Sequence, residues 1–223
     1  MGNCSKPPRV VLLGKQGAGK GTQAARLADH YGTVHLSTGD LFRAQAAQGT
    51  AFGLEAKRYM DSGDLVPDQI VMGVIEECLA PGGPLDDGFV LDGFPRTVPQ
   101  AIDLDRVLGA RPLDLVIDLE VPKEIVLDRI AGRRVCENCQ TVYHVNMPPS
   151  HNWTCDKCGG NVRQRDDDTE EAVERRLELY ERETVPIIDY YREQGLVIMV
   201  DGFGNGDEVF ERLVKVIDDR MQA

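Results

Sequence analysis

The stretch VVLLGKQGAGKGTQ, residues 10–23, decides the fold of this chain. Its apolar start leads directly into residues 14–20, which fit the pattern G-x-x-x-x-G-K between a predicted strand and a predicted helix. Glycines let backbone N–H groups turn inward around phosphate oxygens, the helix N-terminus adds positive potential, and Lys20 adds a full charge. The general pattern continues with Ser or Thr, whereas here Gly21 precedes Thr22. The stretch predicts a phosphate-binding loop, with a glycine-rich turn of no function as the alternative.

Short apolar runs alternate with helical patterns along the rest of the chain. The apolar runs are β-branched and nearly continuous, as is typical of strands buried on both faces of a parallel sheet. The predicted strands are 9–13, 34–36, 89–92, 114–119 and 196–201, and the predicted helices are 22–31, 67–80, 97–108, 122–131, 169–194 and 206–221. The alternation predicts an α/β fold with a doubly wound, five-stranded parallel sheet as the core of residues 9–223.

Two stretches interrupt this alternation and are predicted to be small inserted domains. Residues 38–66 indicate short helices with breaks at Gly49, Gly53 and Gly63. Residues 132–168 contain four cysteines, the turn-rich segment NMPPSHNW and the charge run RQRDDD. The second stretch is too long for an ordinary loop in a compact domain.

Charge and hydropathy exclude several classes of protein. The net charge of −12 argues against general binding to nucleic acid or to anionic membranes. No apolar run approaches the roughly 18–20 residues of a membrane helix, and the start, MGNCSKPPRV, lacks the apolar core of a signal peptide. Gly2 and Cys4 resemble an acylation signal only faintly, because Lys6 replaces the usual Ser or Thr; a frayed polar N-terminus is the alternative. We expect a cytoplasmic protein.

Four of the six cysteines form two Cys-x-x-Cys pairs, Cys136/Cys139 and Cys155/Cys158. In a chain without a secretory signal this spacing favours a metal over disulfides. Four thiolates make a closed tetrahedral zinc site, so the zinc would be structural and would supply folding energy that this polar segment lacks. Rubredoxin-like iron, disulfides and metal-free thiols are the alternatives. His144 lies between the pairs but is not needed as a ligand.

Several motifs carry a resemblance to a known family. GKQGAGKGTQ resembles the phosphate loop of nucleoside monophosphate kinases. STGDLFR (37–43), LDGFPRTVPQA (91–101), DRIAGRR (128–134) and QRDDDTEEAVERRL (164–177) resemble the adenylate kinase family in order and spacing. The similarity covers nearly the whole chain after about residue 9, and the cysteines resemble the zinc-containing lid of the long, bacterial-type members. Gln16 departs from the usual proline; because the proline only stiffens the turn, we expect little consequence.

The resemblance implies an enzyme that transfers the terminal phosphoryl group of ATP to AMP, with Mg²⁺, and gives two ADP. It also implies a monomer with an AMP-binding insertion at 37–66 and a zinc-containing lid over ATP at 132–169. A kinase for another nucleoside monophosphate is the near alternative, although Thr38 and Gln100 resemble the adenine-selective pattern. A zinc-ribbon protein that binds nucleic acid and uses ATP as a switch is the alternative from another class. It would need a basic, aromatic-rich surface, whereas this chain is acidic and 6% aromatic.

The resemblance also implies roles for individual residues, and arginine suits phosphoryl transfer because guanidinium is planar, bidentate and always charged. The implied catalytic residues are Lys20, Arg96, Arg133, Arg165 and Arg176. The implied ATP-binding residues are Gly17, Ala18, Gly19, Lys20, Gly21, Thr22, Arg129, Arg133, Val142, Tyr143 and Gly204. The implied AMP-binding residues are Thr38, Arg43, Asp64, Leu65, Val66, Gly93, Phe94, Pro95, Arg96, Gln100, Arg165 and Arg176.

Three acidic residues complete the predicted site. Asp92 ends the third predicted strand, where it would reach the water shell of Mg²⁺; helix or turn capping is the alternative. Asp167 and Asp168 would either pair with arginines or be solvated acids at the start of the predicted helix 169–194.

Overall fold

The computed structural model describes residues 6–222, so Gly2 and Cys4 lie outside the described residues. A five-stranded parallel sheet forms the centre, in the order β2-β3-β1-β4-β8. Its strands are β1 (Arg9–Leu13), β2 (Val34–Ser37), β3 (Phe89–Asp92), β4 (Leu115–Glu120) and β8 (Val197–Asp201). The prediction of a doubly wound five-stranded parallel sheet is confirmed, with strand ends within about a residue of those expected.

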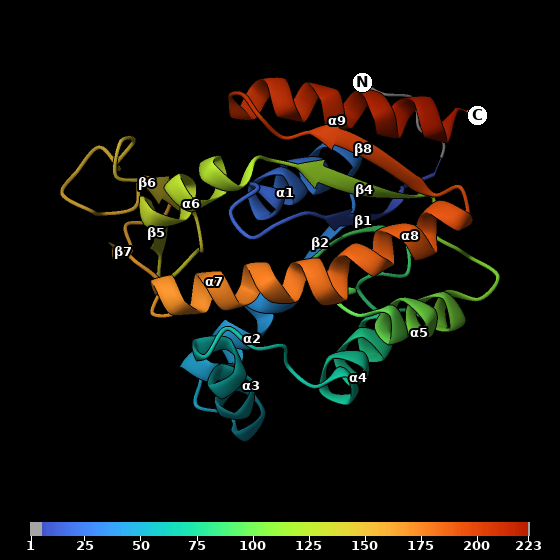
Figure 1. The fold of residues 1–223 in the computed structure, drawn as a ribbon, viewed down its shortest axis with the longest axis horizontal. Coiled ribbons are helices and arrows are strands. Elements are labelled where there is room, and N and C mark those ends of the chain that lie inside the picture. Colours follow the sequence, from blue (N-terminus) through green and yellow to red (C-terminus); the bar gives the residue numbers. More distant parts are fainter. Residues whose placement is uncertain (1–5, 223) are drawn as a thin grey trace.

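Helices cover both faces of this sheet (Figure 1). In β1, Val11 and Leu13 pack on one side with α4 (Asp68–Leu79), α5 (Val98–Leu108) and α8 (Val185–Glu193). Val10 and Leu12 pack on the other side with α1 (Lys20–Tyr31), α6 (Lys123–Ala131) and α9 (Gly206–Met221). Because successive side chains of a strand point to opposite faces, a strand between two helical layers must be apolar at every position.

The register of the strands brings functional positions to one edge of the sheet. Leu12 pairs with Asp92 on β3, Leu13 pairs with Asp118 on β4, and Asp92 pairs with Ser37 on β2. The chain leaves β1 immediately afterwards, at Gly14. The glycine-rich loop therefore begins at the carboxyl ends of the central strands, the edge at which ligands bind in open α/β sheets.

The region predicted as one helix, 169–194, is divided into α7 (Glu170–Leu179), a π-helical segment η1 (Tyr180–Thr184) and α8. The predicted helical segment is confirmed, but it is not one regular α-helix. Pro186 lies in the first turn of α8, where it lacks an N–H group and its ring would clash with the carbonyl of Arg182 in a regular α-helix. The widened turn accommodates the proline without ending the helical path.

Two helices, α2 (Thr38–Ala47) and α3 (Ala51–Asp61), extend from the core between β2 and α4 (Figure 1). Gly49 and Gly63, both with positive φ, lie just beyond the ends of these helices as predicted. Gly53, however, lies inside α3, so the predicted break there is wrong. A Cβ on Gly53 would lie 2.2 Å from the carbonyl carbon of Gln45, so this glycine permits the close approach of α3 to α2.

Replacing Gly53 with Ala is expected to destabilise the protein by about 1–3 kcal/mol, because the methyl group overlaps backbone atoms that cannot move independently. Gly73 provides a matched control, because it lies in the middle of α4 and an added Cβ would meet no other segment of residues 6–222 within 4 Å. Gly73→Ala should stabilise by up to about 1 kcal/mol through helix propensity. Urea unfolding of both variants measures the two changes, and equal shifts would contradict the close-packing explanation.

A small antiparallel sheet follows α6, in the order β6-β5-β7. Its strands are β5 (Arg133–Cys136), β6 (Val142–His144) and β7 (Val162–Arg163). The buried apolar cluster of this unit is very small, consisting of Cys136, Cys155 and Val162 with Cys139 and Tyr143 against it. Apolar burial alone therefore contributes little to holding the unit together.

None of the helices described between residues 6 and 222 combines the length and the apolar character needed to cross a membrane.

Candidate active site

The glycine-rich loop connects β1 to α1 as the sequence pattern requires. Gly14, Gly17 and Gly19 have positive φ, and α1 begins at Lys20, directly after Gly19. No side chain among residues 6–222 caps this helix start, so its free N–H groups face the loop. The loop and the first turn of α1 contain six of the predicted ATP-binding positions, Gly17, Ala18, Gly19, Lys20, Gly21 and Thr22. Free N–H groups at a helix start and a glycine loop together form an anion-binding concavity.

Lys20 lies across this loop. Its Nζ donates hydrogen bonds to the carbonyl oxygens of Gly14, at 2.7 Å, and Lys15, at 2.9 Å. Burial lowers the pKa of Lys20 to about 8, and the positive charges of Arg96 and Arg133 add to the effect against the opposing charge of Asp92. The ammonium group is therefore mostly charged at neutral pH, but poorly solvated, and a phosphate would stabilise it.

Asp92 ends β3 and lies beside the start of α1. Its Oδ2 would be 3.2 Å from a Cβ on Gly21, so a larger residue at position 21 would crowd this carboxylate. Burial would raise the pKa of Asp92, but His35, 3.9 Å away, and the charge of Lys20 outweigh it, so the pKa is lowered. Asp92 is thus a buried carboxylate beside the glycine-rich loop, compatible with a hydrated divalent cation.

Five arginines converge on the space in front of the loop; three aspartates hold four of them, and a backbone carbonyl holds the fifth. Arg43 and Arg165 both contact Asp40, Arg43 and Arg176 contact Asp167, and Arg133 contacts Asp168. Arg96 donates from Nε to the carbonyl oxygen of Gly93 at 2.7 Å. Of the two possibilities for Asp167 and Asp168, pairing with arginines is the one observed, since both residues are buried.

These guanidinium groups are not fully satisfied. The Nε groups of Arg43 and Arg165 are buried without a hydrogen-bond partner among residues 6–222. Burial, together with neighbouring arginines, lowers the pKa of Arg96 and that of Arg165 to about 10. Both side chains remain charged at neutral pH, so positive charge is concentrated there within an acidic protein. Buried donors and concentrated positive charge suit an anionic ligand with several oxygens.

The residues predicted to bind AMP surround a second part of this space. Thr38, at the start of α2, donates from Oγ1 to the carbonyl oxygen of Gly93. Gln100 is buried at the start of α5, accepts from the backbone N–H of Arg96, and donates to Asp68 at 2.6 Å. Phe94 is buried in the core with Val66, and Pro95 connects Phe94 to Arg96. The structure therefore brings together the predicted positions on α2, β3 and α5.

Asp64 and Leu65 lie in the connection from α3 to α4. The carboxylate of Asp64 accepts from Arg175 at 3.0 Å and from the hydroxyl of Ser62 at 3.1 Å. Arg176, next to Arg175 on α7, donates to the carbonyl oxygen of Met60 at 2.7 Å. The side chain of Asp64 thus joins the α3–α4 connection to α7.

Arg129 connects the loop to the segment that follows β8. It donates to the carbonyl oxygens of Ala18, at 3.0 Å, and Gly202, at 3.3 Å, close to Gly204 in the same segment. Val142 and Tyr143 on β6, which were also predicted to contact ATP, do not contact the glycine-rich loop in the way that Arg129 does. Val142 is exposed, and the hydroxyl of Tyr143 donates to Sγ of Cys155 and accepts from the backbone N–H of Asp156.

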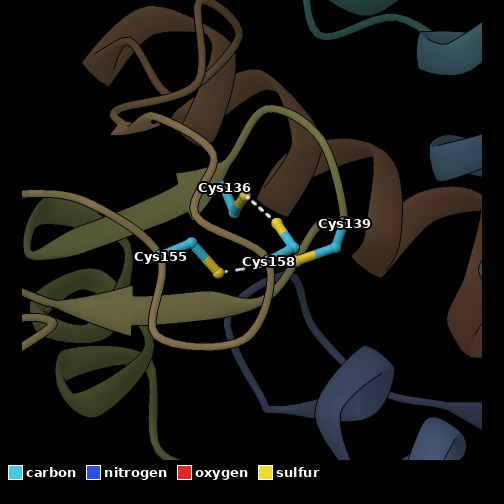
Figure 2. A group of neighbouring side chains, drawn as sticks. All are labelled: Cys136, Cys139, Cys155 and Cys158. Atoms are coloured by element: carbon cyan, nitrogen blue, oxygen red, sulfur yellow. Dashed lines mark hydrogen bonds between the residues drawn. The ribbon is translucent and has the colours of Figure 1, made fainter.

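The four sulfur atoms of Cys136, Cys139, Cys155 and Cys158 converge on one point (Figure 2) and lie within 4.8 Å of one another. The closest Sγ–Sγ distances are 3.5 Å, for Cys136 with Cys158 and for Cys139 with Cys155. A disulfide needs about 2.0 Å, whereas sulfurs at 2.3 Å from a tetrahedral zinc lie roughly 3.8 Å apart. The donor set and spacing fit a structural zinc ion, and neither histidine of the segment belongs to the cluster.

Several residues of the site were not predicted. Asp40 receives Arg43 and Arg165, and Asp68 holds both Gln100 and Thr97. Asp40 could have been found, since it stands three residues before Arg43 in the helical stretch STGDLFR. The contacts of Asp68 with α5 depend on tertiary packing, and no local pattern indicates them.

A glycine-rich loop between β1 and α1 of a parallel sheet, faced by half-buried arginines, defines a nucleotide-binding protein of the P-loop class. The adenylate kinase family matches residues 12–196. Curated adenylate kinases of Thermodesulfovibrio yellowstonii and Streptomyces avermitilis are 48% and 51% identical to the chain. Each comparison covers 94% of the chain and, respectively, 99% and 96% of the relative. That of Clostridium perfringens is 46% identical over 95% of the chain and 98% of its own length. The chain belongs to the adenylate kinase family.

Proposed function

We propose that this chain catalyses ATP + AMP ⇌ 2 ADP with Mg²⁺. The observation that carries the proposal is the group of half-buried arginines in front of the glycine-rich loop, in which the buried Nε groups of Arg43 and Arg165 lack partners among residues 6–222. The names of the relatives support the choice of AMP as acceptor. If ATP and AMP bind with their phosphate groups facing each other, their phosphate oxygens can accept from the N–H groups of these arginines.

Phosphoryl transfer asks the protein mainly for positioning and positive charge. We assign the β- and γ-phosphates of ATP to the loop N–H groups, Lys20 and Arg133, and the AMP phosphate to Arg43 and Arg96. Arg165, which pairs with Asp40, and Arg176, which pairs with Asp167, would act on the transferred group. Their ion pairs with aspartates hold the guanidinium planes in place before the substrates arrive.

The bases are assigned to the two ends of the site. Arg129, which bridges Ala18 and Gly202, would pack on the adenine of ATP. Gln100 would read the adenine of AMP; its amide retains one N–H and one acceptor lone pair beyond the bonds to Asp68 and Arg96. Asp92 would hold the hydrated Mg²⁺ that accompanies ATP.

Structural zinc is the metal that we propose for the cysteine cluster. Zinc bound by four thiolates has no position for water, so it contributes folding free energy and no chemistry. Free cysteines are in keeping with a reducing, cytoplasmic environment.

We further propose that residues 37–66 and 132–169 act as mobile AMP-binding and lid units on a monomeric core. The pairs Asp40–Arg165 and Arg43–Asp167 would join them on closure.

Incubation with ADP and Mg²⁺ alone tests the activity. We expect ATP and AMP to appear in equal amounts, measured by separating the nucleotides over time, and chelation of Mg²⁺ should stop the reaction. If ADP stays intact, AMP is not the acceptor. A panel of nucleoside monophosphates with ATP would then identify another monophosphate kinase, and no transfer to any of them would reject the kinase function.

A further inference from the structure

Gln16, in the glycine-rich loop, makes a contact that its position as a loop residue did not indicate. Its side-chain Nε2 donates to Oδ1 of Asp168, at 3.3 Å, across more than 150 residues of sequence. Asp168 precedes α7, and its side chain is 0% exposed. The amide of Gln16 therefore connects the phosphate-binding loop directly to a buried carboxylate of the segment between β7 and α7.

The same carboxylate holds Arg133. Nε of Arg133 donates to Oδ2 of Asp168 at 2.8 Å, and one terminal nitrogen of Arg133 donates to Oδ1. This fork occupies one edge of the guanidinium and leaves the other terminal nitrogen, Nη1, for a ligand. Oδ1 thus receives both Gln16 and Arg133, so displacement of Asp168 would also displace the arginine.

We propose that Gln16 is a positioning residue that, through Asp168, fixes the guanidinium of Arg133 relative to the phosphate-binding loop. The inference rests on the proposed function, in which Arg133 and the loop bind the same ATP phosphates. A hydrogen bond between loop and carboxylate sets the distance between these two parts of the site before ATP binds. Preorganisation of this kind raises the rate because no rearrangement is needed as the reaction proceeds.

The oxygen atom of the Gln16 amide also supports the positioning role of this residue. Oε1 of Gln16 is buried and has no hydrogen-bond partner among residues 6–222. Burial of an unsatisfied acceptor costs free energy, and an apolar residue or the usual proline would avoid that cost. The amide at this position is therefore explained by its N–H group, which reaches Asp168, and not by packing.

Steady-state kinetics of ADP formation from ATP and AMP tests the proposal in the full-length protein. Gln16→Ala should lower kcat by about tenfold, as expected for loss of a hydrogen bond to a charged group, with KM for AMP and the thermal midpoint unchanged. Gln164→Ala is the matched control. Gln164 also donates to Asp168, but to its backbone carbonyl oxygen, at 3.2 Å, so we expect kcat within about twofold of the unsubstituted enzyme.

A second variant separates positioning from packing. Gln16→Glu keeps the shape of the side chain but places a carboxylate beside Asp168, and at pH 8 it should lose at least as much activity as Gln16→Ala. As the pH falls toward 5.5, the introduced carboxyl group binds a proton and can again donate to Asp168. Its kcat relative to that of the unsubstituted enzyme should therefore recover, whereas that of Gln16→Ala should stay constant.

The outcomes distinguish this inference from the proposed function. An unsubstituted enzyme without activity rejects the proposed function. An active enzyme whose Gln16→Ala variant keeps its kcat rejects only the positioning role, as would equal losses in Gln16→Ala and Gln164→Ala. A lowered thermal midpoint in Gln16→Ala together with a pH-independent loss in Gln16→Glu would indicate a structural role and would also overturn the proposal.

Discussion

Replacement of Lys20 with Met is expected to lower kcat for the disproportionation of ADP by about a thousandfold, the largest effect expected of any single substitution considered. Removal of one preorganised donor costs roughly 10²–10³ in rate, and here the donor also carries a full charge in a partly buried site. Met retains most of the aliphatic length, so it keeps the packing of the stem. It loses the ammonium group that lies over Gly14 and Lys15.

We expect Lys20→Met to lose activity without losing thermal stability. The lowered pKa of Lys20 means that its charged form is poorly accommodated in the absence of phosphate, so the thermal midpoint of Lys20→Met should equal or exceed that of the unsubstituted protein. Lys215→Met, on the exposed side of α9, serves as the control and should retain full activity. Near-normal turnover of Lys20→Met would remove Lys20 from the catalytic role.

Loss of zinc is expected to have the second largest effect, on stability. The purified protein should contain about one zinc per chain. Removal of the zinc with a chelator should uncouple the small sheet, β5 to β7, from the cooperative unfolding of the protein and lower the thermal midpoint. The apolar cluster of this unit has three buried members, two of which are cysteines, so little else would hold it. Structural zinc contributes about 10–16 kcal/mol to the folding of isolated zinc-finger peptides, and a part of that should be lost here.

Activity at low temperature should fall less than stability, because Arg133, although it shares β5 with Cys136, is held by Asp168 and not by the cysteine cluster. Cys158→Ser should lose zinc, whereas Cys78→Ser, in α4 and outside the cluster, should keep it. Metal analysis and differential scanning calorimetry of both variants give the comparison. Iron in place of zinc, or a zinc-free protein that is fully folded yet inactive, would contradict the structural role of zinc.

The features that local patterns could predict were the sheet, the glycine-rich loop and the cysteine pairs. Each depends on residues close in sequence: near-continuous apolar runs for buried strands, glycines followed by Lys20 for the loop, and the two-residue spacing for the cysteines. The arginine positions came from motif resemblance, since a single arginine in a sequence does not differ from a solvated surface charge.

The remaining features depend on packing between distant segments. Gly53 looked like a helix break, because the pattern cannot show that the backbone of Gln45 lies against it. The proline expected at position 16 suggested a residue without a bonding role, whereas the structure gives Gln16 a partner at Asp168. Similarly, nothing near Asp40 in sequence predicts its contact with Arg165, which lies 125 residues away.

The π-helical segment between α7 and α8 changes the angular phase of the helix that contains it. Val173, Leu177, Ile187 and Tyr191 recur with a single 3.6-residue period in the sequence, as if they formed one stripe. A π turn takes up about one extra residue, which rotates everything after it by roughly 100°. Val173 and Leu177 accordingly join the apolar cluster of α1 and α9, whereas Ile187 and Tyr191 join that of α4 and α5. One continuous helix thereby spans both hydrophobic layers of the protein, and deletion of a single residue from 180–184 would turn α8 away from its layer.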